Sequence, residues 1–148
     1  MSNESSVARV PAPVHLWIIG VLAVLWNAGG AFDYLATQLP IESYLEQFTP
    51  EQRAYFESFP AWMTGFWALG VWGALFASIA LLLRSRWAVT LYALSLVGML
   101  GSMGWTVFFS DGLEMMGQGA AWFSAAIVVI GVGLLMYARA MRTRGVLR

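Results

Sequence analysis

The polar side chains inside the apolar parts of this sequence are concentrated in one short stretch. At about 100° per residue on a helix, Asp33 shares a stripe with Trp26 and Thr37, and Asn27 and Tyr34 occupy the adjoining stripe. A carboxylate at membrane depth costs roughly a few kcal/mol, so such groups usually pair or line a wet cavity. We therefore expect a ligand-binding site with Asp33 as its charge or proton site. Its orienting groups are Asn27, Tyr34 and Thr37, and Trp26 is its stacking wall.

Asp33 and Asn27 also have structural interpretations. Asp33 lies about one or two helical turns before Pro40, where its carboxylate can reach interfacial water. Every basic residue except Arg53 belongs to the opposite boundary of the membrane, so we expect Arg53 or the hydroxyl of Thr106 as its partner. Asn27 lies deeper, and its amide needs a hydrogen bond across a helix contact, which favours a role in holding helices together.

Enzymatic chemistry finds little support in the sequence. There is no Ser–His–Asp set, carboxylate pair, glycine-rich phosphate loop or zincin motif, so we expect no catalytic residue. With no cysteine and one histidine, His15, the chain offers no metal site, and we expect no cofactor. The formal net charge is zero and every basic residue is an arginine with no basic stripe, so nucleic acid is not an expected partner.

The elements that position these residues are predicted from apolar length. The chain is 59% hydrophobic and 11% charged, which indicates that most of it faces lipid. A helix needs about 20 mostly apolar residues to cross the hydrocarbon layer, and open sheet edges cannot be satisfied there. We predict an all-α integral membrane protein, a bundle of four transmembrane helices at residues 14–39, 61–83, 87–109 and 119–141. The remaining parts are an exterior segment at 40–60, a disordered tail at 1–13 and a basic tail at 142–148.

Charge distribution predicts the orientation of these helices. Seven of the eight arginines flank the predicted inner ends, and Arg53 is the exception. The opposite side receives acidic residues, so by the positive-inside rule both termini are cytoplasmic. Cleavage of the first span as a signal peptide is the alternative, but its apolar run continues past the small residues 28–31. We expect a multi-pass protein of the bacterial inner membrane with its N-terminus and C-terminus inside.

The exterior segment is expected to contain a short helix that begins at Thr49. Pro50 suits the first helical position, and Gln52 completes a capping box with Thr49. Tyr55, Phe56 and Phe59 recur at helical spacing, which gives this helix an apolar face. The face fits either a surface anchor on the bilayer or a lid over the mouth of the bundle.

Small residues are expected to hold the helices together, because lipid removes most of the hydrophobic drive for helix association. The glycines predicted at helix contacts are Gly30, Gly70, Gly98 and Gly101. Since four helices rarely enclose a pathway alone, a transport function would require a homo-oligomer.

A family resemblance is carried by four stretches of the sequence: residues 26–38, Phe48 to Gln52, Phe59-Pro60-Ala61-Trp62 and residues 66–84. Over nearly its whole length, the chain resembles a family of small, four-span, largely uncharacterised bacterial inner-membrane proteins, some loosely labelled "sugar transporter". The resemblance implies the fold and the bacterial membrane location. Small multidrug transporters also have four short helices, but this sequence lacks a mid-membrane glutamate in its first span and has a long first exterior segment.

Two functions remain open at the level of the sequence. The first is transport or binding of a small-molecule solute at the polar stretch of the first span, by an oligomer. The second is a non-transporting scaffold or accessory subunit that packs against another membrane protein or lipid of the bilayer. In the second case the polar stretch only fixes helix contacts.

Overall fold

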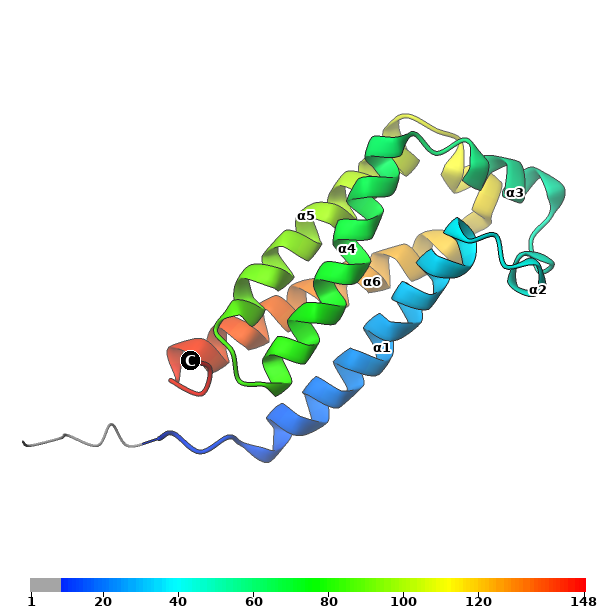
Figure 1. Cartoon of the computed structure of the whole chain (residues 1–148). Coiled ribbons are helices and arrows are strands. Elements are labelled where there is room, and N and C mark those ends of the chain that lie inside the picture. The colour runs from blue at the N-terminus through cyan, green and yellow to red at the C-terminus, as the bar shows by residue number, and fades with distance from the viewer. Residues whose placement is uncertain (1–8) are drawn as a thin grey trace, which may run out of the picture.

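The computed structural model describes residues 9–148, and the part of the N-terminal tail at 1–8 lies outside the described residues. Every element in the described part is a helix, as predicted. Four helices are long and apolar enough to cross a membrane, which makes the chain an all-helical, multi-span type of protein by length and composition. They are α1 (Val14–Gln38), α4 (Ala61–Leu82), α5 (Trp87–Phe108) and α6 (Gly112–Thr143). Two short helices, α2 (Glu42–Leu45) and α3 (Pro50–Glu57), lie between α1 and α4 (Figure 1).

Local sequence explains where these helices begin. Pro13 and Pro60 stand immediately before α1 and α4 in extended conformation. Because a proline disfavours helix in the residue before it, neither helix continues toward the N-terminus. The capping box predicted for α3 is present: the Gln52 backbone N–H donates to Thr49 Oγ1 at 3.2 Å, and the Thr49 backbone N–H donates to Gln52 Oε1 at 3.1 Å. Pro50 occupies the first turn of that helix.

The last long helix starts earlier than the sequence indicated. A helical turn already begins at Gly112, and Gly117, with φ of 79°, separates it from the long part of α6. Positive φ is accessible to glycine without steric cost, so the chain changes direction at this point. The apolar length rule detects the long part of α6, whereas the first turn is less apolar and contacts the exterior segment, where Gln52 Nε2 donates to the Met115 carbonyl.

The helices lie in the order α1, α4, α5, α6, each packed against the next. At the contact of α4 with α5, a Cβ built on Gly98 would stand 2.6 Å from the Phe66 carbonyl oxygen and would also meet the backbone nitrogen of Gly70. Gly101 lies against the Phe66 ring at 2.5 Å on the same measure. Gly30 is less crowded, since its nearest neighbour, Val71 Cγ1, is 3.7 Å away.

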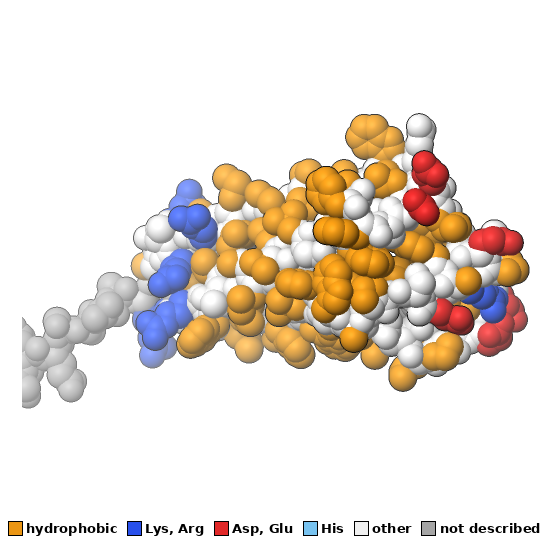
Figure 2. Space-filling view, turned by 90° about the horizontal axis from the view of Figure 1, so that it is seen from above, with side chains coloured by type: hydrophobic (Ala, Val, Ile, Leu, Met, Phe, Trp, Pro, Cys, Tyr) orange, Lys and Arg blue, Asp and Glu red, His pale blue; other side chains and the backbone are white. Residues whose placement is uncertain are grey.

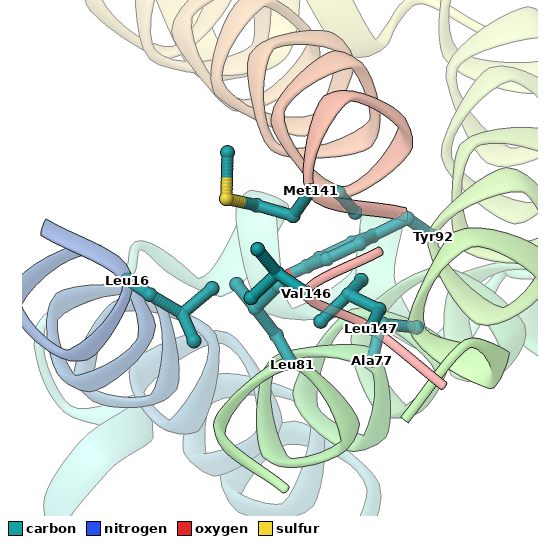
Figure 3. Packing of buried hydrophobic residues seen from close by; sticks show 9 residues of the cluster. Leu16, Ala77, Leu81, Tyr92, Met141, Val146 and Leu147 are labelled. Carbon is teal, nitrogen blue, oxygen red and sulfur yellow. The ribbon is translucent and has the colours of Figure 1, made fainter. Parts of the chain in front are cut away.

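The best-buried apolar cluster lies at the end of the bundle where α1 begins and α6 ends. Its side chains come from all four long helices and from the last residues of the chain. The larger members are Leu16, Leu81, Tyr92, Met141, Val146 and Leu147 (Figure 3). The segment predicted as a basic tail at 142–148 is therefore partly core. After Gly145, with φ of 72°, the chain turns back and buries Val146 and Leu147 to 3% and 4% exposure.

The two ends of the bundle carry opposite charge (Figure 2). Arginines gather at the end that holds residues 9–13 and the C-terminal residues, and acidic side chains gather at the end that holds α2 and α3. We call these the arginine end and the acidic end. Between them lies a band of hydrophobic side chains, many of them exposed, as expected of a surface that faces lipid.

Candidate solute-binding cleft

Asp33 is partnered by a residue that sequence reasoning did not identify. The hydroxyl of Tyr44 donates to Asp33 Oδ1. The chain turns after α1, and Ile41 donates its backbone N–H back to Ala36 at 2.9 Å, which places α2 over the end of α1. Pro40 was the available sequence signal for this contact. It ends α1, and the turn there directs the chain back toward Asp33. Burial first, and the carboxylate of Asp33 second, raise the pKa of the Tyr44 phenol above its ordinary value.

The two partners expected for Asp33 are engaged elsewhere. The Arg53 guanidinium donates to Glu42 Oε1 at 2.8 Å and to the Leu45 carbonyl oxygen at 2.9 Å. The hydroxyl of Thr106 donates to the Ser102 carbonyl one turn earlier, at 3.3 Å. Both expectations were therefore wrong. Helix α3 holds the Arg53 guanidinium against α2, and the Thr106 hydroxyl bonds within its own helix.

Asn27 belongs to a separate buried network, nearer the middle of the bundle. Its amide Nδ2 donates to Ser78 Oγ on α4 at 3.0 Å, the cross-helix hydrogen bond that its depth predicted. Ser78 Oγ donates to the Ala74 carbonyl at 2.8 Å, so its single hydrogen is used. The Tyr92 hydroxyl, 2.8 Å from Ser78 Oγ, must therefore be the donor in that contact. The network joins α1, α4 and α5 and does not include Asp33.

The three remaining predicted site residues do not converge on one point. Trp26 is 40% exposed and meets Phe123 of α6 with ring centroids 6.0 Å apart. Tyr34 packs edge-on against Trp67 of α4, with centroids 5.0 Å apart. The Thr37 hydroxyl donates to the Asp33 carbonyl at 2.9 Å, and Thr37 alone of the five predicted residues lines the cleft described next.

A cleft of about 400 Å³ opens at the acidic end, between the end of α1, the exterior segment and the start of α4. Its polar wall carries hydroxyl, amide, carboxylate and guanidinium groups, and its apolar wall carries two phenyl rings. The lining residues are Thr37, Gln38, Pro40, Glu42, Leu45, Arg53, Phe56, Glu57, Phe59 and Thr64. Sequence reasoning missed most of them, because they come from four segments that only the fold brings together.

Negative charge predominates at this cleft. Glu42 is paired with Arg53, whereas Glu57 makes no ion pair within the described residues. The acidic end around the cleft adds further carboxylates and contains one arginine, Arg53. The acidic residues at this end are Asp33, Glu42, Glu46, Glu51, Glu57, Asp111 and Glu114. A cleft lined by one sign of charge concentrates ligands of the opposite sign.

Aromatic side chains connect the cleft to the bundle. Phe56 lies 5.9 Å from Phe59 between ring centroids, Phe59 lies 6.1 Å from Trp67, and Trp67 meets Tyr34. Most of these contacts are edge-on, a preferred geometry for aromatic pairs. The faces of phenyl rings attract cations, so the apolar wall has the same preference as the carboxylates.

Helix α3 crosses the acidic end (Figure 1). Side-chain hydrogen bonds fasten it on both sides. Arg53 ties it to α2, as described above. On the other side the Tyr55 hydroxyl lies 2.9 Å from Ser110 Oγ, and Gln52 Nε2 donates to the Met115 carbonyl at 3.3 Å. These bonds hold α3 against the α5–α6 connection. Of its aromatic side chains, Tyr55 contacts that connection, and Phe56 lines the cleft.

Within residues 9–148, the structure groups no set of three or more histidine, aspartate or glutamate side chains that could hold a metal ion. The groups that line the cleft can form hydrogen bonds, ion pairs and contacts with aromatic rings. No protein-family model, no curated protein and no solved structure matches this chain.

Proposed function

We propose that the chain binds a small organic cation in the cleft at the acidic end, as the binding step of small-solute transport across the bacterial inner membrane. The observation that supports this proposal is the combination, in one cleft, of the unpaired carboxylate of Glu57 with the rings of Phe56 and Phe59. A carboxylate gives an ammonium group a charge partner, and phenyl faces contact its alkyl substituents.

Asp33 has a secondary role in this proposal. It lies behind the cleft, where its bond to Tyr44 fixes α2 and so places Glu42 and Leu45 in the cleft wall. The proposed binding site is therefore the cleft at the acidic end and not the polar stripe of α1 that the sequence suggested. Asn27 and Trp26 belong to helix contacts in this proposal.

Transport would require more than one copy of the chain. The bundle of four helices leaves several glycines facing open space, with no atom within 4 Å of an added Cβ: Gly29, Gly65, Gly104, Gly119 and Gly133. Such positions allow close approach of another helix, which supports association into a homo-oligomer. The distribution of charges at the two ends supports an orientation with the cleft outside and the arginine end in the cytoplasm.

Calorimetric titration of the purified protein in lipid nanodiscs tests the binding step. Choline is the cationic probe, glycerol the neutral probe and acetate the anionic probe. We expect choline to bind and the other two to bind at least about tenfold more weakly, a difference of about 1.4 kcal/mol. Equal binding of choline and glycerol would contradict the proposal.

Two substitutions that remove the same charge sharpen this test. Glu57→Gln removes the unpaired carboxylate of the cleft, and Glu46→Gln removes an exposed carboxylate outside the cleft. We expect choline affinity to fall about tenfold in the first variant and to change less than about twofold in the second. If both variants lost affinity equally, general charge at the acidic end rather than the cleft would bind the cation.

Orientation can be tested on the same chain, which has no cysteine. Ser43→Cys places a thiol at the acidic end and Thr143→Cys places one at the arginine end, both at exposed positions. In intact cells, a thiol reagent that does not cross membranes should label the first variant and leave the second unlabelled. The reverse pattern would place the cleft in the cytoplasm.

A further inference from the structure

The arginine end carries unbalanced positive charge. Its arginines are Arg9, Arg84, Arg86, Arg139, Arg142, Arg144 and Arg148, and the acidic side chains of residues 9–148 lie at the other end (Figure 2). The ion pair found among the described residues, Arg53 with Glu42, also belongs to the other end. The arginine end therefore has no acidic side chain beside it within residues 9–148.

One of these arginines is already committed to the fold. The Arg84 guanidinium donates to the Val146 carbonyl at 3.1 Å and to the Val10 carbonyl at 2.6 Å. In contrast, Arg86, Arg139 and Arg142 are exposed, and none of their side chains makes a hydrogen bond in the described part of the chain. We call these three residues the arginine collar.

The collar is held by ordered backbone. Arg139 and Arg142 stand three residues apart on α6, which places them on one face of the helix. Arg86 is fixed by its backbone N–H, which donates to the Arg148 carbonyl at 2.8 Å, while the Arg148 N–H donates to the Arg84 carbonyl at 2.8 Å. Ordered positions reduce the entropy that each arginine loses when it binds a ligand.

In a bilayer, two exposed tryptophans near this end would set the collar at the level of lipid headgroups. Trp87 follows Arg86 directly and is 62% exposed, and Trp17, near the start of α1, is 45% exposed. Tryptophan side chains favour the boundary between hydrocarbon and headgroups. A guanidinium beside that boundary can bind a phosphodiester through two parallel hydrogen bonds, which an ammonium cannot do.

We propose that the arginine collar binds the headgroups of anionic phospholipids in the leaflet next to it, in preference to zwitterionic ones. This inference rests on insertion of the four helices in a bilayer and is independent of the cation cleft at the other end. The partner is a lipid with net negative charge at its phosphodiester, such as phosphatidylglycerol. Each basic residue near an anionic surface contributes about a fivefold gain in association.

Tryptophan quenching by brominated lipids measures this preference. The full chain is reconstituted in mixtures of phosphatidylcholine with brominated phosphatidylglycerol or brominated phosphatidylcholine. We expect phosphatidylglycerol to associate at least about threefold more strongly at about 0.05 M salt, and the preference to shrink at about 0.5 M salt, where the Debye length is much shorter. Equal association of the two lipids at low salt would overturn the proposal.

Two double variants locate the effect. Arg139→Gln with Arg142→Gln should remove most of the preference, whereas Arg139→Lys with Arg142→Lys retains charge and should keep most of it. An unchanged preference in the glutamine variant would overturn the assignment to the collar. If that variant does not fold, native mass spectrometry of the wild-type chain decides, by the ratio of phosphatidylglycerol to phosphatidylcholine that stays bound.

Inorganic phosphate separates a lipid site from a free anion site. Because hydrocarbon chains and neighbouring arginines both hold the lipid in place, about 10 mM inorganic phosphate should not displace phosphatidylglycerol beyond the effect of salt of equal ionic strength. Displacement beyond that effect would assign the collar to a soluble phosphate compound and overturn the lipid proposal.

Discussion

The guanidinium of Arg84 holds the carbonyl oxygen of Val146 at 3.1 Å, and Arg84 itself has φ of 57°. An arginine in the left-handed region costs about 1–2 kcal/mol relative to a right-handed conformation, and glycine is the usual residue there. Arg84 lies just after the end of α4, where its backbone N–H donates to the Leu81 carbonyl and the Ser85 N–H donates to the Ala80 carbonyl. We infer that the side chain offsets the backbone cost by fastening the C-terminal segment and residue Val10 to the end of α4.

Substitution of Arg84 separates the backbone cost from the side-chain gain. Arg84→Ala keeps the unfavourable φ and loses the hydrogen bonds to two carbonyls, so we expect a loss of about 1–3 kcal/mol in unfolding free energy. Arg84→Gly loses the same bonds and relieves the backbone, so it should be about 1 kcal/mol more stable than Arg84→Ala. Unfolding in mixed detergent micelles measures both values.

Arg86→Ala is the matched control for these variants, because Arg86 is exposed and contributes its backbone to the C-terminal contact. We expect its unfolding free energy to stay within about 0.5 kcal/mol of the wild-type value. An Arg84→Ala variant as stable as Arg86→Ala would show that the guanidinium does not fasten the C-terminal segment.

Ser78 is predicted to be the critical member of the buried network, because it accepts from Asn27 and from Tyr92. Ser78→Ala leaves both donors without their acceptor, and an unsatisfied buried polar group costs about 1–3 kcal/mol. Hydrogen bonds between membrane helices average nearer about 0.6 kcal/mol, so we expect a total loss of about 1–2 kcal/mol. Ser102→Ala is the control, since its hydroxyl donates within its own helix, to Met99 at 3.0 Å.

A double-mutant cycle assigns this loss to the network. If Ser78 acts by accepting from Tyr92, then Tyr92→Phe should cost less in the Ser78→Ala background than in the wild type. Unfolding free energies of the four chains, measured in the same micelles, give the coupling. Additive effects of the two substitutions would mean that the hydroxyls do not stabilise each other.

The sequence predicted the helices much better than it predicted the site. Four apolar stretches of membrane length and the capping box at Thr49 are local signals, and each matches a helix or a helix start in the structure. The partner of Asp33 is different in kind, because Tyr44 reaches it through a turn that depends on how α2 folds over α1. Likewise, the charges at 142–148 indicated a basic tail and gave no sign of core residues, but Val146 and Leu147 are buried in the apolar cluster that the four long helices form.

The contact of α4 with α5 should tolerate no side chain at Gly98. A Cβ there would meet the backbone of Gly70 and the Phe66 carbonyl, so Gly98→Ala must force the two helices apart. We expect a loss of more than about 2 kcal/mol in unfolding free energy, as for other overpacked contacts. Gly104→Ala on the same helix is the control: nothing lies within 4 Å of its added Cβ, and alanine favours helix by up to about 1 kcal/mol over glycine. Similar effects of the two substitutions would contradict the close helix contact.

The bond between Tyr44 and Asp33 should make the cap formed by α2 and α3 sensitive to alkaline pH. Burial and the neighbouring carboxylate raise the pKa of Tyr44 in the folded protein, so its proton is held more tightly there than in the unfolded chain. The stabilisation is therefore fully present below about pH 10, the ordinary pKa of tyrosine, and is lost as the pH rises above it toward the raised pKa of the folded state.

Limited proteolysis of the exterior segment measures this dependence, because Arg53 provides a trypsin site in α3. Cleavage at Arg53 should be nearly constant from about pH 8 to about pH 10 in the wild type and should accelerate above about pH 10, after correction for the activity of the protease on an unfolded peptide. In Tyr44→Phe the hydrogen bond to Asp33 is absent at every pH, so cleavage should be faster at about pH 8 and should rise less with pH. Asp33→Asn keeps an acceptor but removes the charge that opposes ionisation of Tyr44, so its dependence should begin at a lower pH than in the wild type. A wild-type rate that did not change over this range would mean that Tyr44 does not hold the cap.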